Sequence, residues 1–172
     1  MPYRFLLLGL ASAALIACGT PQPKPPQAIA KLQAISGSKV RGDVKFTQAE
    51  QKVMVSAVIY GLKPNSEHGF HIHEKGDCAE NGNAAGGHFN PLGNNHGKYD
   101  GPQHHMGDLP SLMADSNGVA TVNVESPDIS LLEGQGNIIG RAVIVHAQAD
   151  DFVTQPTGNS GARIGCAVIT RN

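Results

Sequence analysis

Six short stretches of apolar and β-branched residues dominate the hydrophobic pattern of the chain. They lie at residues 28–35, 40–46, 53–62, 119–124, 141–146 and 162–169, and turn-forming Gly, Pro, Asn or Ser residues follow closely. Alternating or continuous apolar runs of this length are typical of β-strands. The stretch 53–62 has apolar residues on both faces, so we expect it to be covered on both sides. No sustained apolar stripe of helical period is present, and the pattern therefore predicts an all-β sandwich or flattened antiparallel barrel.

The segment 74–108 breaks this pattern. It contains eight Gly, two Pro and five Asn, a composition that predicts almost no regular structure. Structureless segments of this length are uncommon inside compact domains unless they are functional. Because the segment also carries His, Asp and Cys, we expect metal ligation and a disulfide at Cys78 to order it.

Histidine is the unusual residue of the composition. Seven of the eight His fall between His68 and His105. If residues 69–74 form a strand, His71 and His73 leave the same face, where two imidazoles can chelate a metal ion. His146 ends another apolar run and could reach the same end of the sheet. The remaining candidates are His88, His96, and His105 with Asp108. Six His and one Asp are too many for one tetrahedral zinc, so two ions are the simpler interpretation.

Net charge excludes two classes of protein. The chain has 13 Lys+Arg against 14 Asp+Glu, a formal charge of -1. It is therefore neither a nucleic-acid-binding polycation nor an acidic tail, and we expect no nucleic-acid partner.

The N-terminus has the pattern of a secretory signal. Residues 5–17 form an apolar run of 13 preceded by Arg4, which is shorter than the roughly 20 residues that span a bilayer. The end of this run, Leu15-Ile16-Ala17-Cys18, resembles the lipobox of bacterial lipoproteins, and an ordinary signal peptide with a chance Cys is the alternative. We expect a signal peptide at 1–17, a lipidated Cys18 that opens a Pro-rich tether at 18–27, and a folded domain at 28–172. The protein would be anchored to the bacterial cell membrane, on its extracellular face or in the periplasm.

Export also bears on the other two cysteines. Cys78 and Cys166 form an even pair in a compartment where disulfides persist, so we predict a bridge between them. Two buried reduced thiols are the alternative.

Five separated motifs carry a resemblance to a known family. GFHIHEKGDC, GGHFNP, HHMGDLP, GRAVIVHAQADD and GNSGARIGCAVI occur in this order, and together they resemble the copper,zinc superoxide dismutases, here of a bacterial, exported, lipoprotein type. The resemblance covers nearly the whole domain after the tether. It implies a Greek-key β-sandwich or flattened eight-stranded antiparallel barrel with two long functional loops. It also implies an enzyme that converts superoxide to dioxygen and hydrogen peroxide and protects the cell envelope.

The resemblance also implies one copper and one zinc ion per subunit. The copper ligands would be His71, His73, His88 and His146. The zinc ligands would be His88, His96, His105 and Asp108, with His88 bridging the two ions. Four imidazoles suit copper, and three His with one Asp suit a structural zinc.

Further roles follow from the same motifs. Asp150 would orient one copper-ligating and one zinc-ligating His. Arg163 would receive the anionic substrate and act with His88 in catalysis, and Thr157 would line the access channel. Pro156 stands where many animal members carry a Lys, which leaves open which cations steer the substrate.

Two His lie outside this set. Only His105 keeps the three-residue offset to Asp108, so we expect His104 to be exposed. We expect His68 to make a hydrogen bond in a loop rather than bind a third ion.

Two other functions are compatible with parts of the sequence. A non-catalytic copper or zinc carrier would use the same ligands, and an adhesive β-sandwich with one zinc would explain the fold and the tether. The complete copper set and Arg163 favour the enzyme over both. The sequence does not choose between a monomer and a homodimer.

Overall fold

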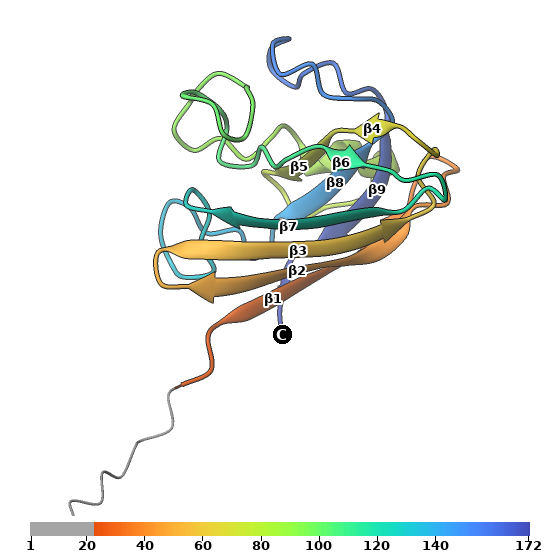
Figure 1. Cartoon of the computed structure of the whole chain (residues 1–172). Helices are drawn as coiled ribbons and strands as arrows, with labels where there is room; N and C mark the ends of the chain where they lie inside the picture. Colours follow the sequence, from red (N-terminus) through yellow and green to blue (C-terminus); the bar gives the residue numbers. More distant parts are fainter. Residues whose placement is uncertain (1–22) are drawn as a thin grey trace, which may run out of the picture.

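The structure is a computed structural model that describes residues 23–172. The predicted signal peptide at 1–17 and the predicted lipidation site Cys18 lie outside these residues, as does the first part of the predicted tether. The main element is a curled antiparallel sheet whose hydrogen-bonded order is β5-β8-β9-β1-β2-β3-β7, with β10 paired to β1 (Figure 1). The strands are β1 (Gln27–Ala34), β2 (Arg41–Ala49), β3 (Lys52–Tyr60), β5 (Phe70–His73), β7 (Ala120–Ser126), β8 (Ala142–His146), β9 (Arg163–Val168) and β10 (Thr170–Arg171).

The all-β prediction is confirmed. Each of the six predicted strands is present, with boundaries that differ by at most three residues. The sequence did not indicate β10, the two-stranded sheet of β4 (Glu67–His68) and β6 (Leu112–Met113), or the 3-10 segment η1 (Glu80–Ala85). Among residues 23–172, no helix has the length and apolar character needed to cross a membrane.

The core lies inside the curl of the sheet. On β3, Val53, Val55 and Ile59 are fully buried there, because alternate side chains of a strand leave opposite faces. On the outer face, Val58 and Tyr60 are 39% and 41% exposed. The expectation that this strand is covered on both sides is therefore wrong: the sheet is antiparallel and has one face in water.

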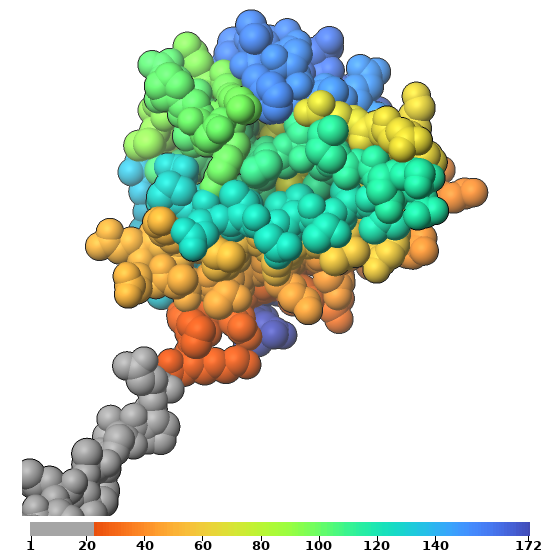
Figure 2. Space-filling view, viewed as in Figure 1, coloured from red at the N-terminus to blue at the C-terminus, as the bar shows by residue number. Residues whose placement is uncertain are grey.

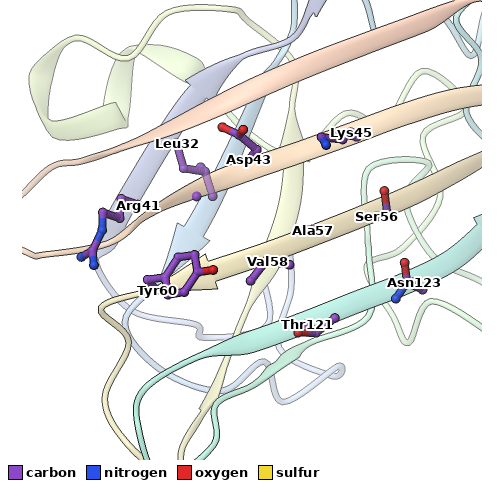
Figure 3. Close-up of a pocket in the computed structure, with 11 residues that line it drawn as sticks. Leu32, Arg41, Asp43, Lys45, Ser56, Ala57, Val58, Tyr60, Thr121 and Asn123 are labelled. Carbon is purple, nitrogen blue, oxygen red and sulfur yellow. The ribbon is translucent and has the colours of Figure 1, made fainter.

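An open hollow of about 580 Å³ occupies this outer face (Figure 3). Its walls come from β1, β2, β3 and β7, and it is lined by Leu32, Arg41, Gly42, Asp43, Lys45, Ser56, Ala57, Val58, Tyr60, Thr121 and Asn123. None of these residues is a His. The candidate chemistry therefore lies elsewhere in the fold.

Two long loops lie on one side of the molecule, beside β5 and β8. They are the segments 74–108 and 147–162, and Figure 2 shows their green and blue parts adjoining at the top. The chain enters the sheet through β1 on the opposite side (Figure 1). The predicted ligands come from the two loops and from the strands next to them.

Candidate metal centre

Strand β5 organises the site because both of its edges are used. One edge pairs with β8. The other edge receives the loop 74–108: the Ile72 N–H donates to Gly107 O at 2.8 Å, and the Phe89 N–H donates to Ile72 O at 2.8 Å. These bonds place His88 opposite His73 and Asp108 opposite His71. Backbone hydrogen bonds thus order the loop in addition to the metal ligation and the disulfide that the sequence predicted.

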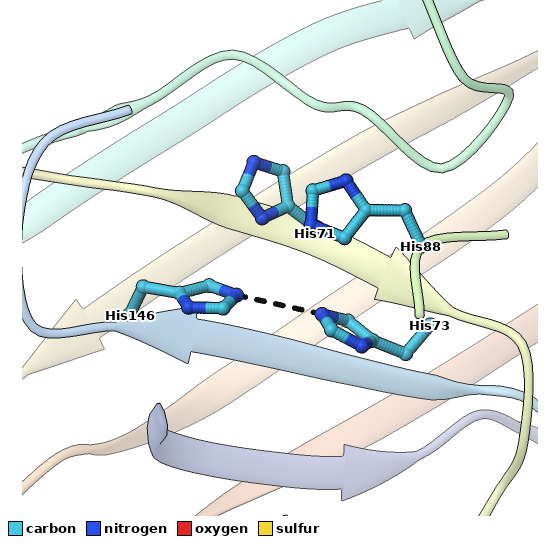
Figure 4. A group of neighbouring side chains, drawn as sticks. All are labelled: His71, His73, His88 and His146. Carbon is cyan, nitrogen blue, oxygen red and sulfur yellow. Dashed lines mark hydrogen bonds between the residues drawn. The ribbon is translucent and has the colours of Figure 1, made fainter. Parts of the chain in front are cut away.

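The first cluster consists of His71, His73, His88 and His146 (Figure 4). All four are buried, and one nitrogen from each lies within 4.8 Å of the others. The Nε2 atoms of His73 and His146 face each other at 3.4 Å. His71 and His73 come from β5, and His146 ends β8. Pairing of these two strands therefore brings together His73 and His146, which are 73 residues apart.

Hydrogen bonds fix which nitrogen of each ring carries the hydrogen. The His71 Nε2–H donates to Asp150 Oδ2 at 2.7 Å. The His73 Nδ1–H donates to Gly86 O at 2.9 Å, and the His146 Nδ1–H donates to Gly161 O at 3.3 Å. Because carboxylates and carbonyls only accept, the opposite nitrogen of each ring keeps its lone pair for the centre of the cluster.

The second cluster consists of His88, His96, His105 and Asp108, again with one ligand atom from each within 4.8 Å. The Nδ1 atoms of His88 and His96 lie 2.8 and 3.0 Å from the Asp108 carboxylate. His88 belongs to both clusters. Its Nδ1 faces Asp108, and its Nε2 has no hydrogen-bond partner.

Unpartnered buried atoms test whether these residues fit metal ions. Within residues 23–172, four buried side-chain nitrogen or oxygen atoms lack a hydrogen bond, and three of them are His71 Nδ1, His88 Nε2 and His105 Nδ1. Buried polar atoms are nearly always paired, so three lone pairs left free in two adjoining clusters are what metal ligation requires. Four imidazoles suit copper, and three imidazoles with a carboxylate suit zinc.

Asp150 connects the two clusters by hydrogen bonds to one ring of each. Its carboxylate accepts from His71 Nε2 at 2.7 Å and from His96 Nε2 at 2.9 Å. Gly158 makes this possible: its φ is +65°, and a Cβ there would lie 1.9 Å from Asp150 Oδ1. Asp150 therefore holds one ring of each cluster in orientation, in the geometry that outer carboxylates adopt at metal sites.

Burial keeps three rings of the first cluster, His71, His73 and His146, neutral. Burial and then the neighbouring His88 lower the pKa of His71 to about 4, and burial and His71 lower the pKa of His146 to about 3. Burial and then His88 also hold the pKa of His73 well below its ordinary value. Neutral imidazoles are the form that binds a cation, so these rings need no deprotonation near neutral pH.

In the second cluster burial lowers the pKa of His105, whereas His96 and Asp108 are shifted toward their charged forms. Burial opposes the charged form of His96, but hydrogen bonds with Asp108 and Asp150 outweigh it and raise the pKa of His96 to about 9. Burial likewise opposes ionisation of Asp108, yet hydrogen bonds with His88 and His96 lower its pKa. The cluster thus contains a stable buried carboxylate.

Arg163 lies beside the first cluster and is held by main-chain carbonyls. Its guanidinium donates to Gly82 O and, at 2.6 Å, to Gly86 O. The Gly86 carbonyl also accepts from His73, so the cation and a cluster ring share one acceptor. Burial lowers the pKa of Arg163, but a guanidinium stays charged.

The predicted disulfide is confirmed. Cys78 and Cys166 are bonded, with a Cα–Cα distance of 5.9 Å, and the bond ties the segment before η1 to β9. The loop residues that hold Arg163 are therefore attached covalently to the strand that carries it.

Two peripheral His lie outside the clusters. The prediction that His104 is exposed is wrong: its side chain is only 16% exposed and Nε2 pairs with Asp128 at 3.2 Å. An acidic partner 24 residues away was not visible in the sequence. His68 makes a hydrogen bond as expected, but it is fully buried in β4 and its Nδ1–H donates to His146 O at 2.8 Å.

In the loop 147–162, Gln155 forms hydrogen bonds with a cluster residue, whereas the predicted channel residue Thr157 does not. Thr157 is half-buried there, and within the described residues its side chain has no hydrogen bond to either cluster. Gln155 was missed by the sequence analysis, yet its side chain bonds the main chain of His96 at 2.8 and 2.9 Å. A lone Gln in a loop carries no signal in the sequence that could have identified it.

Comparison with known proteins agrees with this geometry. The family model described as copper/zinc superoxide dismutase matches residues 40–169. The chain is 46% identical to the Cu-Zn superoxide dismutase of Paramecium bursaria Chlorella virus 1, covering 85% of this chain and 79% of the relative. It is 36% identical to the superoxide dismutase-like protein YojM of Bacillus subtilis, covering 99% and 97%.

Two solved structures are also similar. The clock protein EA4 superposes with a TM-score of 0.76 at 39% identity, covering 88% of this chain and 98% of that chain. A double mutant of a SOD-like protein from Bacillus subtilis superposes with a TM-score of 0.75 at 40% identity, covering 83% and 96%. The similarity therefore extends to the Greek-key fold as well as to the sequence.

Proposed function

The chain belongs to the copper/zinc superoxide dismutase family, and from this premise we propose that it works outside the cytoplasm, held at the cell envelope by a lipid on Cys18. It is an oxidoreductase that converts superoxide to dioxygen and hydrogen peroxide, with copper and zinc as cofactors. The observation that carries the metal chemistry is a pair of buried clusters that share His88.

We assign the two ions by donor type. Copper would be held by His71, His73, His88 and His146, and zinc by His88, His96, His105 and Asp108. When bound, copper supplies the one-electron chemistry of both halves of the reaction. The free lone pairs of His71, His88 and His105 support this assignment.

Two side chains would act on the substrate. Arg163 would bind the superoxide anion, because its cation is held beside the first cluster by Gly82 O and Gly86 O. Whenever His88 Nε2 is not a copper ligand, it would hold a proton next to the bound anion, while His88 Nδ1 stays in the second cluster and keeps the ring in place. The formal charge of the chain is only -1, so attraction of the anion depends on the local cation.

The proposed anchor agrees with the arrangement of the fold. The chain enters the sheet at β1, on the side away from the loops 74–108 and 147–162 (Figure 1). A lipid on Cys18 would leave the metal centre facing away from the membrane. Attachment by two or more acyl chains is stable because each buried CH₂ contributes roughly 0.8 kcal/mol. The enzyme would remove superoxide that arises outside the cytoplasm and thereby protect the envelope.

Fractionation of a bacterial host that expresses the full chain tests the location. Wild-type protein should sediment with membranes, whereas Cys18→Ser should be exported and recovered in the soluble fraction with its dismutase activity intact. A Cys18→Ser protein that has lost its signal peptide and still stays with the membranes would refute the lipid anchor. Active protein confined to the cytoplasm would refute export.

Metal titration tests the chemistry. Superoxide decay should be fast with the copper-plus-zinc protein and absent with the metal-free and zinc-only proteins. Tight copper binding without dismutation would identify a metal carrier instead.

A further inference from the structure

Gln155 forms a double hydrogen bond with the main chain of one metal-cluster residue. Its Oε1 accepts from the His96 N–H at 2.8 Å, and its Nε2 donates to His96 O at 2.9 Å. The two residues are 59 positions apart, in the loops 147–162 and 74–108. We propose that Gln155 is a positioning residue for the zinc site: Gln155 holds His96 in place and couples the two loops. The proposal rests on the assignment of zinc to His88, His96, His105 and Asp108.

His96 depends on this contact more than the other cluster residues do. His71 and His73 are held in β5, and His88 is held by its bridge to His73. The main-chain oxygen of His105 accepts from the Asp108 N–H at 3.1 Å. His96 lies in no strand, and within the described residues its N–H and its carbonyl have no partner other than Gln155.

The ring contacts of His96 do not replace this support. Nδ1 lies 3.0 Å from Asp108, and Nε2 donates to Asp150 at 2.9 Å. These contacts orient the imidazole, but the position of the Cα from which it projects is set by the backbone. Because His96 is only 3% exposed, water is a poor substitute for the lost partners.

The Gln155 amide is itself oriented by a third bond. Nε2 also donates to Val153 O at 3.2 Å, so the amide nitrogen faces two carbonyls and the amide oxygen faces an N–H. Only this orientation satisfies all three partners. The loop that carries Gln155 also carries Asp150, so it holds His96 by both its ring and its main chain.

By holding His96 in place, Gln155 should make zinc release slower than it would be without this side chain. Removal of outer partners of metal ligands commonly weakens binding by roughly 10–100-fold. Gln155 is solvent-exposed and acts through the backbone of the ligand, so we expect the lower end, an increase of about tenfold in the zinc release rate for Gln155→Ala.

The experiment follows zinc loss from the full-chain copper-plus-zinc protein into excess 4-(2-pyridylazo)resorcinol. Gln155→Ala should release zinc about tenfold faster than wild type. Gln155→Glu keeps an acceptor for the His96 N–H but places an oxygen against His96 O, so it should also release zinc faster. Gln148→Ala is the matched control, because that Gln is exposed in the same loop and its side chain has no hydrogen bond within the described residues; its rate should not change.

Two further measurements separate positioning from general destabilisation. Co²⁺ placed in the zinc site should show an altered visible spectrum in Gln155→Ala, while the rate of copper release stays near that of wild type. Equal acceleration of copper and zinc release, or a zinc rate within twofold of wild type in both Gln155 variants, would overturn the proposal. If wild-type protein fails to retain one zinc per chain, the metal assignment fails instead. If Gln155→Ala does not fold, the comparison rests on Gln155→Glu.

Discussion

Removing the disulfide should lower the free energy of unfolding by about 4–6 kcal/mol. The perturbation is Cys78→Ala combined with Cys166→Ala, which avoids leaving a free thiol. The two residues are 88 positions apart. In the chain-entropy treatment, closing a loop of this length removes about 15 cal/mol/K from the unfolded chain, or about 4.6 kcal/mol at 25 °C. Loss of sulfur from the small apolar cluster with Ala85 and Ile144 adds up to about 1 kcal/mol.

The same bond has a local effect at the metal centre. It ties the segment before η1 to β9. Arg163 is held by two carbonyls, Gly82 O within η1 and Gly86 O at its end. Without the bond the Arg163 cation should be less well placed. We therefore expect both weaker inhibition by azide, a small anion, and slower dismutation by the copper-plus-zinc double variant.

Urea unfolding of the metal-free proteins at pH 7, followed by far-UV circular dichroism, measures the stability without a contribution from metal binding. Ile35→Val removes one methylene from the same cluster and leaves the bridge intact, so it should cost only about 1 kcal/mol. A loss below about 1 kcal/mol in the double variant would refute the entropy reasoning. Unchanged azide inhibition would refute the link from the disulfide to Arg163.

Three more outcomes follow from the structure. His146→Ala should abolish dismutation while metal analysis still finds zinc, because His146 belongs only to the first cluster; an active variant would contradict the copper assignment. Gly158→Ala places a Cβ 1.9 Å from Asp150 Oδ1 and should weaken copper and zinc binding in competition titrations by roughly 10–100-fold. In the metal-free protein, burial lowers the pKa of His71 to about 4 and of His146 to about 3, below the 6.5 of the unfolded chain. The unfolded chain then binds more protons, so the free energy of unfolding should fall as the pH drops from about 6.5 to about 4, and a flat urea-unfolding profile over this range would contradict the shifts.

Local sequence patterns were sufficient for the strands. Each of the six predicted strands is a short alternating or continuous run of apolar residues, and a strand buried on one or both faces requires such a run, because alternate side chains leave opposite faces. His71 and His73 could be placed on one face for the same reason. The error at the outer face of β3 arose because Val58 and Tyr60 are apolar but exposed, and a hydrophobic residue need not be buried.

The loops show where sequence reasoning ends. Segments 74–108 and 147–162 have no periodic pattern, so their conformation depends on partners far away in the chain. The edge of β5, the Asp150 carboxylate and the Gln155 amide supply those partners. His104 was misplaced for the same reason, since its partner Asp128 lies beyond the loop.

The sequence by itself determined the all-β class, the cysteine pair and the residue types of two metal sites, because these depend on local periodicity, composition and motif spacing. Only the tertiary structure decided which nitrogen of each ring is free and that His96 is held by Gln155. These features depend on hydrogen bonds between residues many positions apart, and such bonds have no local trace in the order of the amino acids.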